Sequence, residues 1–167
     1  GENYDSASST LLPSMNSDWQ GISAIANFEL GEYTLTSVSS YDSIDYQRFI
    51  DADATPVQFQ DIDYATEIDF WQQEFRLAYN GSDSLSWIVG INYSADELVE
   101  STLLMGAEGV LPLFFGGATF SPQDYEQKTE AFAVYGHGEW QFADTLRATA
   151  ELRYTDEEKS FVGGQQF

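Results

Sequence analysis

Apolar and polar residues alternate along most of this chain with the period of a β-strand. In the stretch LSWIVGINYS, residues 85–94, every odd position is Leu, Trp, Val, Ile or Tyr, and most even positions are small or polar. Successive side chains of a strand point to opposite faces, so this stretch has one apolar and one polar face. The pattern recurs six times and predicts strands near 20–30, 33–42, 69–80, 85–95, 129–142 and 146–160.

The six predicted apolar faces contain no charged residue. They consist of alternate residues in 22–30, 33–41, 71–79, 85–93, 132–142 and 146–154. Each element has about the length of a membrane-spanning strand, roughly 9–11 residues. The polar faces, in contrast, carry long charged side chains at mid-strand, namely Glu74, Arg76, Glu139, Glu151 and Arg153.

The predicted connections alternate between short and long. Gly31-Glu32 has the length and the leading glycine of a two-residue hairpin turn, and residues 80–84 and 143–145 make two more short turns. Two long acidic loops are predicted near 42–69 and 95–128, and loops of that length usually serve a function. In an antiparallel sheet all short turns lie at one end and both long loops at the other.

Charge and composition exclude several classes of protein. The chain has 28 acidic and 6 basic residues and a formal charge of −22, which argues against binding nucleic acid or anionic lipid headgroups. Cysteine is absent, so the sequence holds no disulfide or thiolate metal site. No stretch approaches the roughly 20 apolar residues of a transmembrane helix, and the first ten residues do not have the pattern of a signal peptide.

Alternation alone does not distinguish a membrane barrel from a soluble antiparallel sandwich, because both have one apolar face. Three features favour the barrel: aromatic residues near the strand ends, short turns opposite long loops, and charged side chains on the polar face. The alternative is a soluble β-sandwich module that binds carbohydrate or holds Ca²⁺ in its acidic loops. Arginine at the outward positions Trp87 or Leu152 would separate the two, since charge on a lipid face costs about 2–4 kcal/mol at the midplane.

Three segments resemble the barrel of TonB-dependent outer-membrane receptors. WQQEFRLAYNGSDSLSWIVGINYSADE is similar to a recurrent strand, Asn-Gly turn and strand of that family. TEAFAVYGHGEWQFADTLRATAELRYTDEEKSF resembles the hairpin that follows, with Glu151 where the family has glycine, and LGEYTLTSVSSYDS resembles a further strand. The matches run in the family's order and cover about residues 21–161.

The resemblance implies an all-β fold, an antiparallel up-and-down meander of about six strands from a 22-stranded transmembrane barrel. It implies import of a scarce ligand such as a ferric siderophore across the outer membrane of a Gram-negative bacterium, without catalysis or cofactor. Implied partners are outer-membrane lipid, a small-molecule ligand such as an iron complex, and TonB. TonB would act through N-terminal parts that this sequence lacks. The sequence contains no plug domain or TonB box, so residues 1–167 are expected to be an interior piece of a barrel domain.

Candidate site residues are few, and each also has a plain structural interpretation. His137 could bind a metal or relay protons, but a solvated lumen residue is the favoured interpretation. The Glu74/Arg76 and Glu151/Arg153 pairs could line a lumen against a plug, although ordinary charge pairing on a wet face is favoured. The residues that contact the ligand are not predicted.

The two predicted loops offer two more candidates. Asp51-Ala52-Asp53 is the best local choice for a calcium ion, yet the EF-hand pattern is absent and a solvated loop is the favoured interpretation. The apolar run VLPLFFGGATF, residues 110–120, could contact a ligand or pack on a neighbouring loop. Glycoside hydrolysis stays open on acidic composition alone, but no nucleophile-elbow, zinc-protease or P-loop motif is present.

Overall fold

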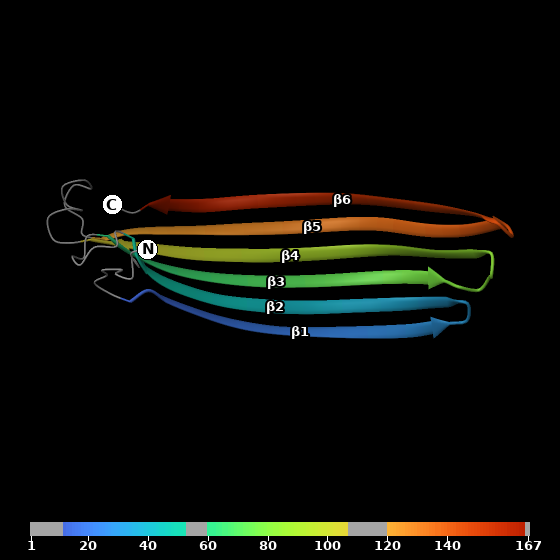
Figure 1. Cartoon of the computed structure of the whole chain (residues 1–167), viewed down its shortest axis with the longest axis horizontal. Coiled ribbons are helices and arrows are strands. Elements are labelled where there is room, and N and C mark those ends of the chain that lie inside the picture. The colour runs from blue at the N-terminus through green and yellow to red at the C-terminus, as the bar shows by residue number, and fades with distance from the viewer. Residues whose placement is uncertain (1–11, 53–59, 107–119, 166–167) are drawn as a thin grey trace, which may run out of the picture.

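The fold is a single antiparallel sheet of six strands that lie side by side in chain order (Figure 1). The computed structural model describes residues 12–52, 60–106 and 120–165. The strands are β1 (Ser14–Leu30), β2 (Tyr33–Asp51), β3 (Asp61–Tyr79), β4 (Leu85–Met105), β5 (Phe120–Ala143) and β6 (Leu146–Gln165). This confirms the predicted all-β meander of six strands, and within the described residues the sheet does not close on itself.

The short turns all lie at one end of the sheet, as predicted. We call this the lower end of the sheet, which is at the right in Figure 1. Gly31 has a φ of 70°, a left-handed conformation that glycine adopts without strain, so the chain reverses within two residues. The turn pairs Leu30 with Tyr33, which puts both side chains on one face. The longer connections, between β2 and β3 and between β4 and β5, lie at the upper end.

The two long loops were predicted wrongly, because most of residues 42–69 and 95–128 are strand. β2 continues to Asp51, β3 begins at Asp61, and β4 and β5 stay paired from Met105↔Phe120 downward. The strands are therefore 17–24 residues long, about twice the length expected for crossing a membrane. Backbone pairing does not end where the apolar face ends, and the acidic residues of the predicted loops belong to the sheet.

The two faces of the sheet differ in crowding. We call the face of Val89, Phe132 and Leu152 the outer face, and these side chains are 45%, 43% and 79% exposed. On the opposite, inner face Ala133 and Thr129 are only 2% and 8% exposed, because larger neighbours shield them. Such shielding is expected on the inside of a curved wall.

No second layer of chain covers the outer face anywhere in the described ranges. A β-sandwich buries its apolar face against another sheet, so the fold does not support the soluble-sandwich alternative. In the same ranges no helix is long and apolar enough to span a bilayer.

Candidate functional site

The outer face carries an apolar belt of the same height on every strand. We define the belt as residues 22–30, 33–41, 71–79, 85–93, 132–140 and 146–154, nine positions on each strand. The outward side chains within it are apolar, aromatic or small, apart from Gln73, which contacts Ser39 and Ser37 through hydrogen bonds of 2.5 and 3.1 Å. At its centre is an apolar depression of about 310 Å³, lined by residues such as Leu35, Phe75 and Val134.

The belt drifts across the hydrogen-bonded rows of the sheet in two steps, by two residues between β3 and β4 and by two more between β5 and β6. At its upper limit Tyr154 on β6 aligns, strand by strand, with Ala26 on β1, four residues from Ile22. The lower limit shifts equally, because Leu146 lies four residues beyond the row that contains Leu30. Both limits of the belt, defined as nine positions on each strand, therefore move by the same four residues.

This drift has a simple geometric meaning. Four residues correspond to about 13 Å along a strand, and five strand spacings correspond to about 24 Å. The strands are therefore tilted by about 30° from the normal of a flat slab that contains the belt. This is close to the roughly 35–45° strand tilt of membrane barrels. Nine residues at that tilt span about 23 Å, compared with about 25 Å for the apolar band of outer-membrane proteins.

Aromatic rings mark both limits of the belt, as predicted. At the lower limit Tyr33, Tyr79 and Trp87 form one cluster, with ring centroids 5.2–6.0 Å apart. At the upper limit Trp71 and Tyr93 lie 5.7 Å apart. Rings with polar atoms favour the two interfaces of a membrane, because one part contacts hydrocarbon and the other water.

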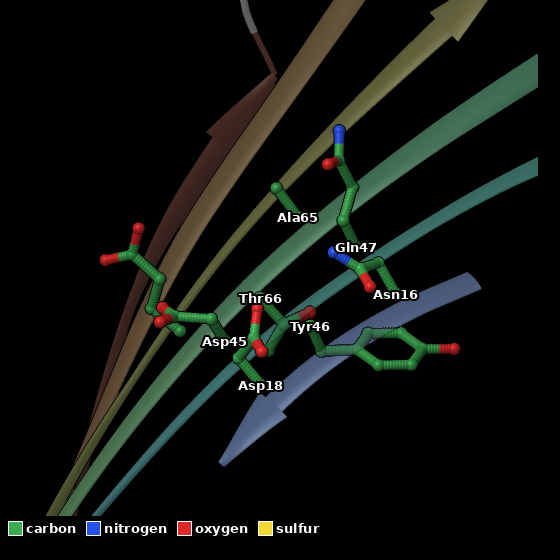
Figure 2. A pocket seen from close by; sticks show the side chains of 8 residues that line it. Asn16, Asp18, Asp45, Tyr46, Gln47, Ala65 and Thr66 are labelled. Atoms are coloured by element: carbon green, nitrogen blue, oxygen red, sulfur yellow. The ribbon is translucent and has the colours of Figure 1, made fainter. Parts of the chain in front are cut away.

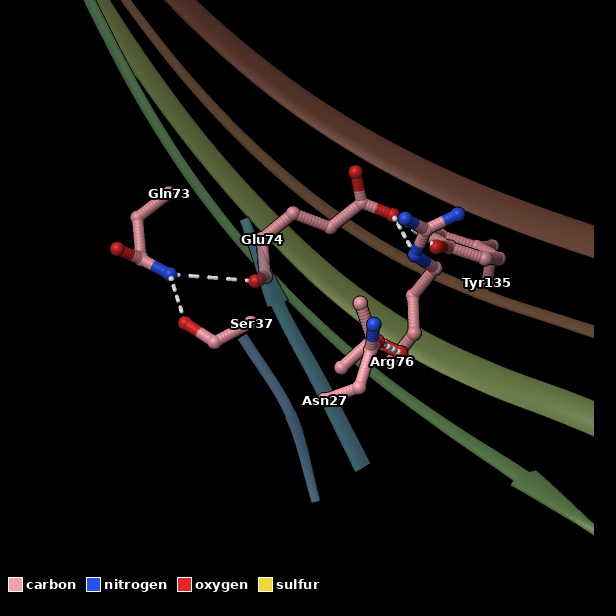
Figure 3. Close-up of polar contacts among 7 residues, drawn as sticks. Asn27, Ser37, Gln73, Glu74, Arg76 and Tyr135 are labelled. Carbon is pink, nitrogen blue, oxygen red and sulfur yellow. Dashed lines mark hydrogen bonds and ion pairs between the residues drawn. The ribbon is translucent and has the colours of Figure 1, made fainter. Parts of the chain in front are cut away.

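A polar network crosses the inner face at the height of the belt (Figure 3). Tyr135 on β5 donates a hydrogen bond to Glu74 on β3, and Arg76 Nε lies 3.3 Å from Glu74 Oε1. Gly90 on the intervening strand makes this possible, since a Cβ there would overlap the Tyr135 ring. Arg153 on β6 lies over the same ring, with its Cζ 5.7 Å from the centroid. The Glu74/Arg76 pair is thus an ordinary ion pair within a network that links three strands, β3, β5 and β6, across Gly90 on β4.

Glu151 and Arg153 do not pair with each other, which corrects the predicted charge pair. Arg153 Nε donates to Thr155 Oγ1 at 3.1 Å, and Glu151 Oε2 lies 4.0 Å from His137 Nδ1. His137 Nε2 is 3.6 Å from Glu139 Oε1, so the histidine stands between two carboxylates on the inner face. In the described ranges no group of three such side chains is placed to hold a metal ion.

Above the belt the polarity of the two faces is reversed. We call this part the upper wall: residues 14–21, 42–51, 61–70, 94–105, 120–131 and 155–165. One outward row consists of Asp18, Asp45, Glu67, Val99, Glu126 and Val162. One inward row consists of Trp19, Ile44, Ile68, Leu98, Gln127 and Phe161. The inward row was not predicted. Its apolar character could have been found from Ile44, Ile68 and Leu98, which lie at even positions on strands whose belt residues are odd.

The acidic outward row lines an open groove of about 340 Å³ (Figure 2). Asp18 and Asp45 are neighbours in the register, and Asn16 and Gln47 extend the lining upward. Nearby, Lys128 Nζ lies 2.6 Å from Glu126 Oε1 and 3.3 Å from the corresponding oxygen of Glu97. Hydrogen bonds from the ammonium to these two carboxylates raise the pKa of Lys128.

The remaining predicted site residues are only partly accounted for. Asp51 ends β2 and pairs with Asp61, whereas Asp53 lies outside the described residues, so the favoured solvated loop and its calcium alternative both stay predictions. Of the run 110–120 only Phe120 is placed, at the start of β5, and the rest also lies outside the described residues.

The inner face of the upper wall contains a carboxylate with several donors around it. Thr66 Oγ1 lies 3.3 Å from Glu100 Oε2, and Thr102 Oγ1 lies 3.4 Å from Glu100 Oε1. A hydrogen bond to Glu100, together with burial, raises the pKa of Tyr125 to about 12. The Tyr125 ring also packs against Phe161, with centroids 5.6 Å apart.

Comparison with solved structures assigns this fold to the class of β-barrel walls. The chain is similar to the ferric yersiniabactin uptake receptor FyuA from Yersinia pestis, with a TM-score of 0.74 and 13% sequence identity. The match covers 92% of this chain and 24% of the receptor, so the chain spans about a quarter of that protein's length. At this identity the likeness shows the fold alone.

Two porins are much less similar. The KdgM porin has a TM-score of 0.15 and 10% identity, with 92% of this chain and 95% of the porin covered. A porin of Rh. blastica has a TM-score of 0.15 and 8% identity, with 88% and 89% covered. No protein-family model and no curated protein matches the sequence.

Proposed function

We propose that the chain is part of the wall of an outer-membrane β-barrel. The observation that carries this proposal is the apolar belt: its nine positions on each of six strands carry no charged outward side chain, and the belt drifts by four residues across the strands. A slab of hydrocarbon around tilted strands requires such a pattern, whereas a sheet surrounded by water on both faces does not.

We further propose that the barrel belongs to a TonB-dependent receptor that imports a scarce ligand, such as a ferric siderophore. Two independent observations support this: the likeness in fold to a quarter of a siderophore uptake receptor, and the three sequence segments that resemble the receptor family. The barrel would bind and pass the ligand without catalysis. TonB would supply the energy for import.

The four tryptophans allow the membrane proposal to be tested directly. Trp71 lies at the upper limit of the belt, Trp87 and Trp140 lie near its lower limit, and Trp19 is on the inner face above it. Each variant of the full-length protein keeps one of these four as its only tryptophan. The variants are reconstituted with lipids brominated along the acyl chain. Bromine should quench the three belt tryptophans and leave Trp19 unaffected. Equal quenching of all four, or of none, would reject the membrane wall.

The import proposal needs a separate test. Cells of the source organism that lack the gene should take up less ⁵⁵Fe supplied with the siderophores from their own culture medium, and the intact gene should restore uptake. Uptake that does not change when the gene is deleted would count against iron import while leaving the barrel proposal standing.

A further inference from the structure

The apolar depression of about 310 Å³ at the centre of the belt lies on strands β2 to β5. Its outward lining residues are Leu35, Phe75, Leu77, Val89, Ile91 and Val134. Four of them, on β3, β4 and β5, are 42–46% exposed, although each of these strands is paired on both sides. The opening is therefore a feature of the outer face and does not result from a free edge of the sheet.

A polar cluster borders the upper side of this depression. It consists of Ser37, Ser39 and Gln73, which all face outward within the belt. Gln73 Nε2 donates to Ser37 Oγ at 3.1 Å and to the carbonyl of Glu74 at 3.2 Å (Figure 3), and Ser39 Oγ donates to Gln73 Oε1 at 2.5 Å. Ser37 pairs across the strands with the lining residue Phe75, so the polar cluster and the depression adjoin.

The polar cluster lies below the interface, where hydrocarbon offers no hydrogen-bond partner. Gln73 follows Trp71 by two residues, which places it about 6 Å below the upper limit of the belt at a tilt of about 30°. Among the described residues, Ser37 accepts a hydrogen bond from Gln73 and donates none, and Gln73 Oε1 accepts only from Ser39. A hydroxyl can donate one hydrogen bond and an amide oxygen can accept two, so the cluster keeps one donor and one acceptor for a ligand.

We infer that the depression and the polar cluster together bind one acyl chain of a membrane lipid that carries a hydroxyl group near its head. The alkyl part fills the depression, and the hydroxyl accepts a hydrogen bond from Ser37 and donates one to Gln73 Oε1. An unsubstituted chain fits the same depression but leaves the donor and the acceptor facing hydrocarbon, which is unfavourable. This inference rests on the proposed membrane wall, to which it adds the class of lipid.

Two esters that differ by one hydroxyl group provide the probes, methyl 3-hydroxytetradecanoate and methyl tetradecanoate. The full-length protein in detergent micelles is mixed with equal amounts of both, and native mass spectrometry counts the protein adducts of each. The counts are corrected for the partitioning of each ester into empty micelles. We expect the hydroxylated ester to be favoured by about two- to tenfold, the range that one net hydrogen bond provides.

Two variants separate the polar and the apolar parts of the site. Ser37→Ala, Ser39→Ala and Gln73→Leu together remove the polar cluster and make the belt more apolar. This variant should bind both esters, with a ratio near one. Val89→Phe combined with Val134→Phe fills the depression and should weaken the binding of both esters.

The chain offers a matched control in the adjacent hydrogen-bonded row. Ser40, Gln72 and Ser94 pair across β2, β3 and β4 and face inward, away from the proposed lipid. Ser40→Ala, Gln72→Leu and Ser94→Ala make the same three changes of side chain and should keep the preference of the parent protein. Both adducts are counted in one sample, so their ratio does not depend on the yield of folded protein.

Several results would overturn the inference. They are a ratio below about two in the parent protein, a preference that survives removal of the polar cluster, a control that loses the preference, or unchanged binding when the depression is filled. Quenching by brominated lipid tests the membrane wall separately. Normal quenching with equal binding of the two esters would reject this inference alone, whereas absence of quenching would reject the membrane wall as well.

Discussion

Val89 occupies the position where a charged side chain should be most unfavourable in a membrane. It is the central residue of the belt on β4, four residues, or about 13 Å, from both Leu85 and Tyr93. Its side chain is 45% exposed on the outer face. If hydrocarbon covers that face, Val89→Arg should lower the free energy of unfolding by about 2–4 kcal/mol. If water covers it, the same change should stay within about 0.5 kcal/mol.

The depth profile makes this prediction specific to a membrane. Leu85→Arg, at the lower limit of the belt, should cost only about 0–1 kcal/mol. Asn92→Arg, on the inner face of the same strand, should also cost little because that face is wet. The measurement is reversible unfolding of the full-length protein from phospholipid vesicles in guanidinium chloride, followed by tryptophan fluorescence. A similar cost at all three positions, or a small cost at Val89, would refute the assignment of the outer face to lipid.

Three further outcomes are expected. Gly90→Val should destabilise the protein by about 1–3 kcal/mol, because the new side chain overlaps Tyr135, and combining it with Tyr135→Ala should cost less than the sum of the two changes in denaturant unfolding. Because the pKa of Tyr125 is raised from 10.0 to about 12 in the folded protein, its stabilising contribution is complete below pH 10 and is lost as the pH rises towards 12. Tyr125→Phe should remove that part of the pH dependence in alkaline denaturation, and an unchanged profile would contradict the Glu100 contact. The isolated 167-residue chain should aggregate without detergent, since β1 and β6 have free edges, and a monomer in light scattering would contradict this.

The belt region could be predicted from sequence because two signals agree there. Period-two alternation identifies the outer residues, and the two-residue turn at Gly31 fixes the register of β1 with β2. The structure confirms this pairing, with Leu30 opposite Tyr33 and Phe28 opposite Leu35. Both signals are local, so they do not depend on knowing the rest of the chain.

The upper wall was missed because its alternation is inverted. Before Trp71, β3 carries acidic residues at most outward positions, from Asp61 to Asp69, so a search for a continuous apolar outer face ends at Trp71. The apolar residues continue at even positions, as in Ile68 and Ile62, and these residues form the inner face. The inner network was also not predictable, since Glu74 and Tyr135 are 61 residues apart and meet across a glycine on the strand between them.

The inversion indicates that different solvents set the two halves of each strand. Below the aromatic residues at the upper limit of the belt, an outward charge would face hydrocarbon, so the charged side chains are confined to the inner face. Above this limit the outer face is wet and tolerates the acidic row, but folding alone does not require apolar side chains on the inner face. Charged substitutions at outward positions of the belt should therefore impair assembly in the membrane, whereas charged substitutions at outward positions of the upper wall should not.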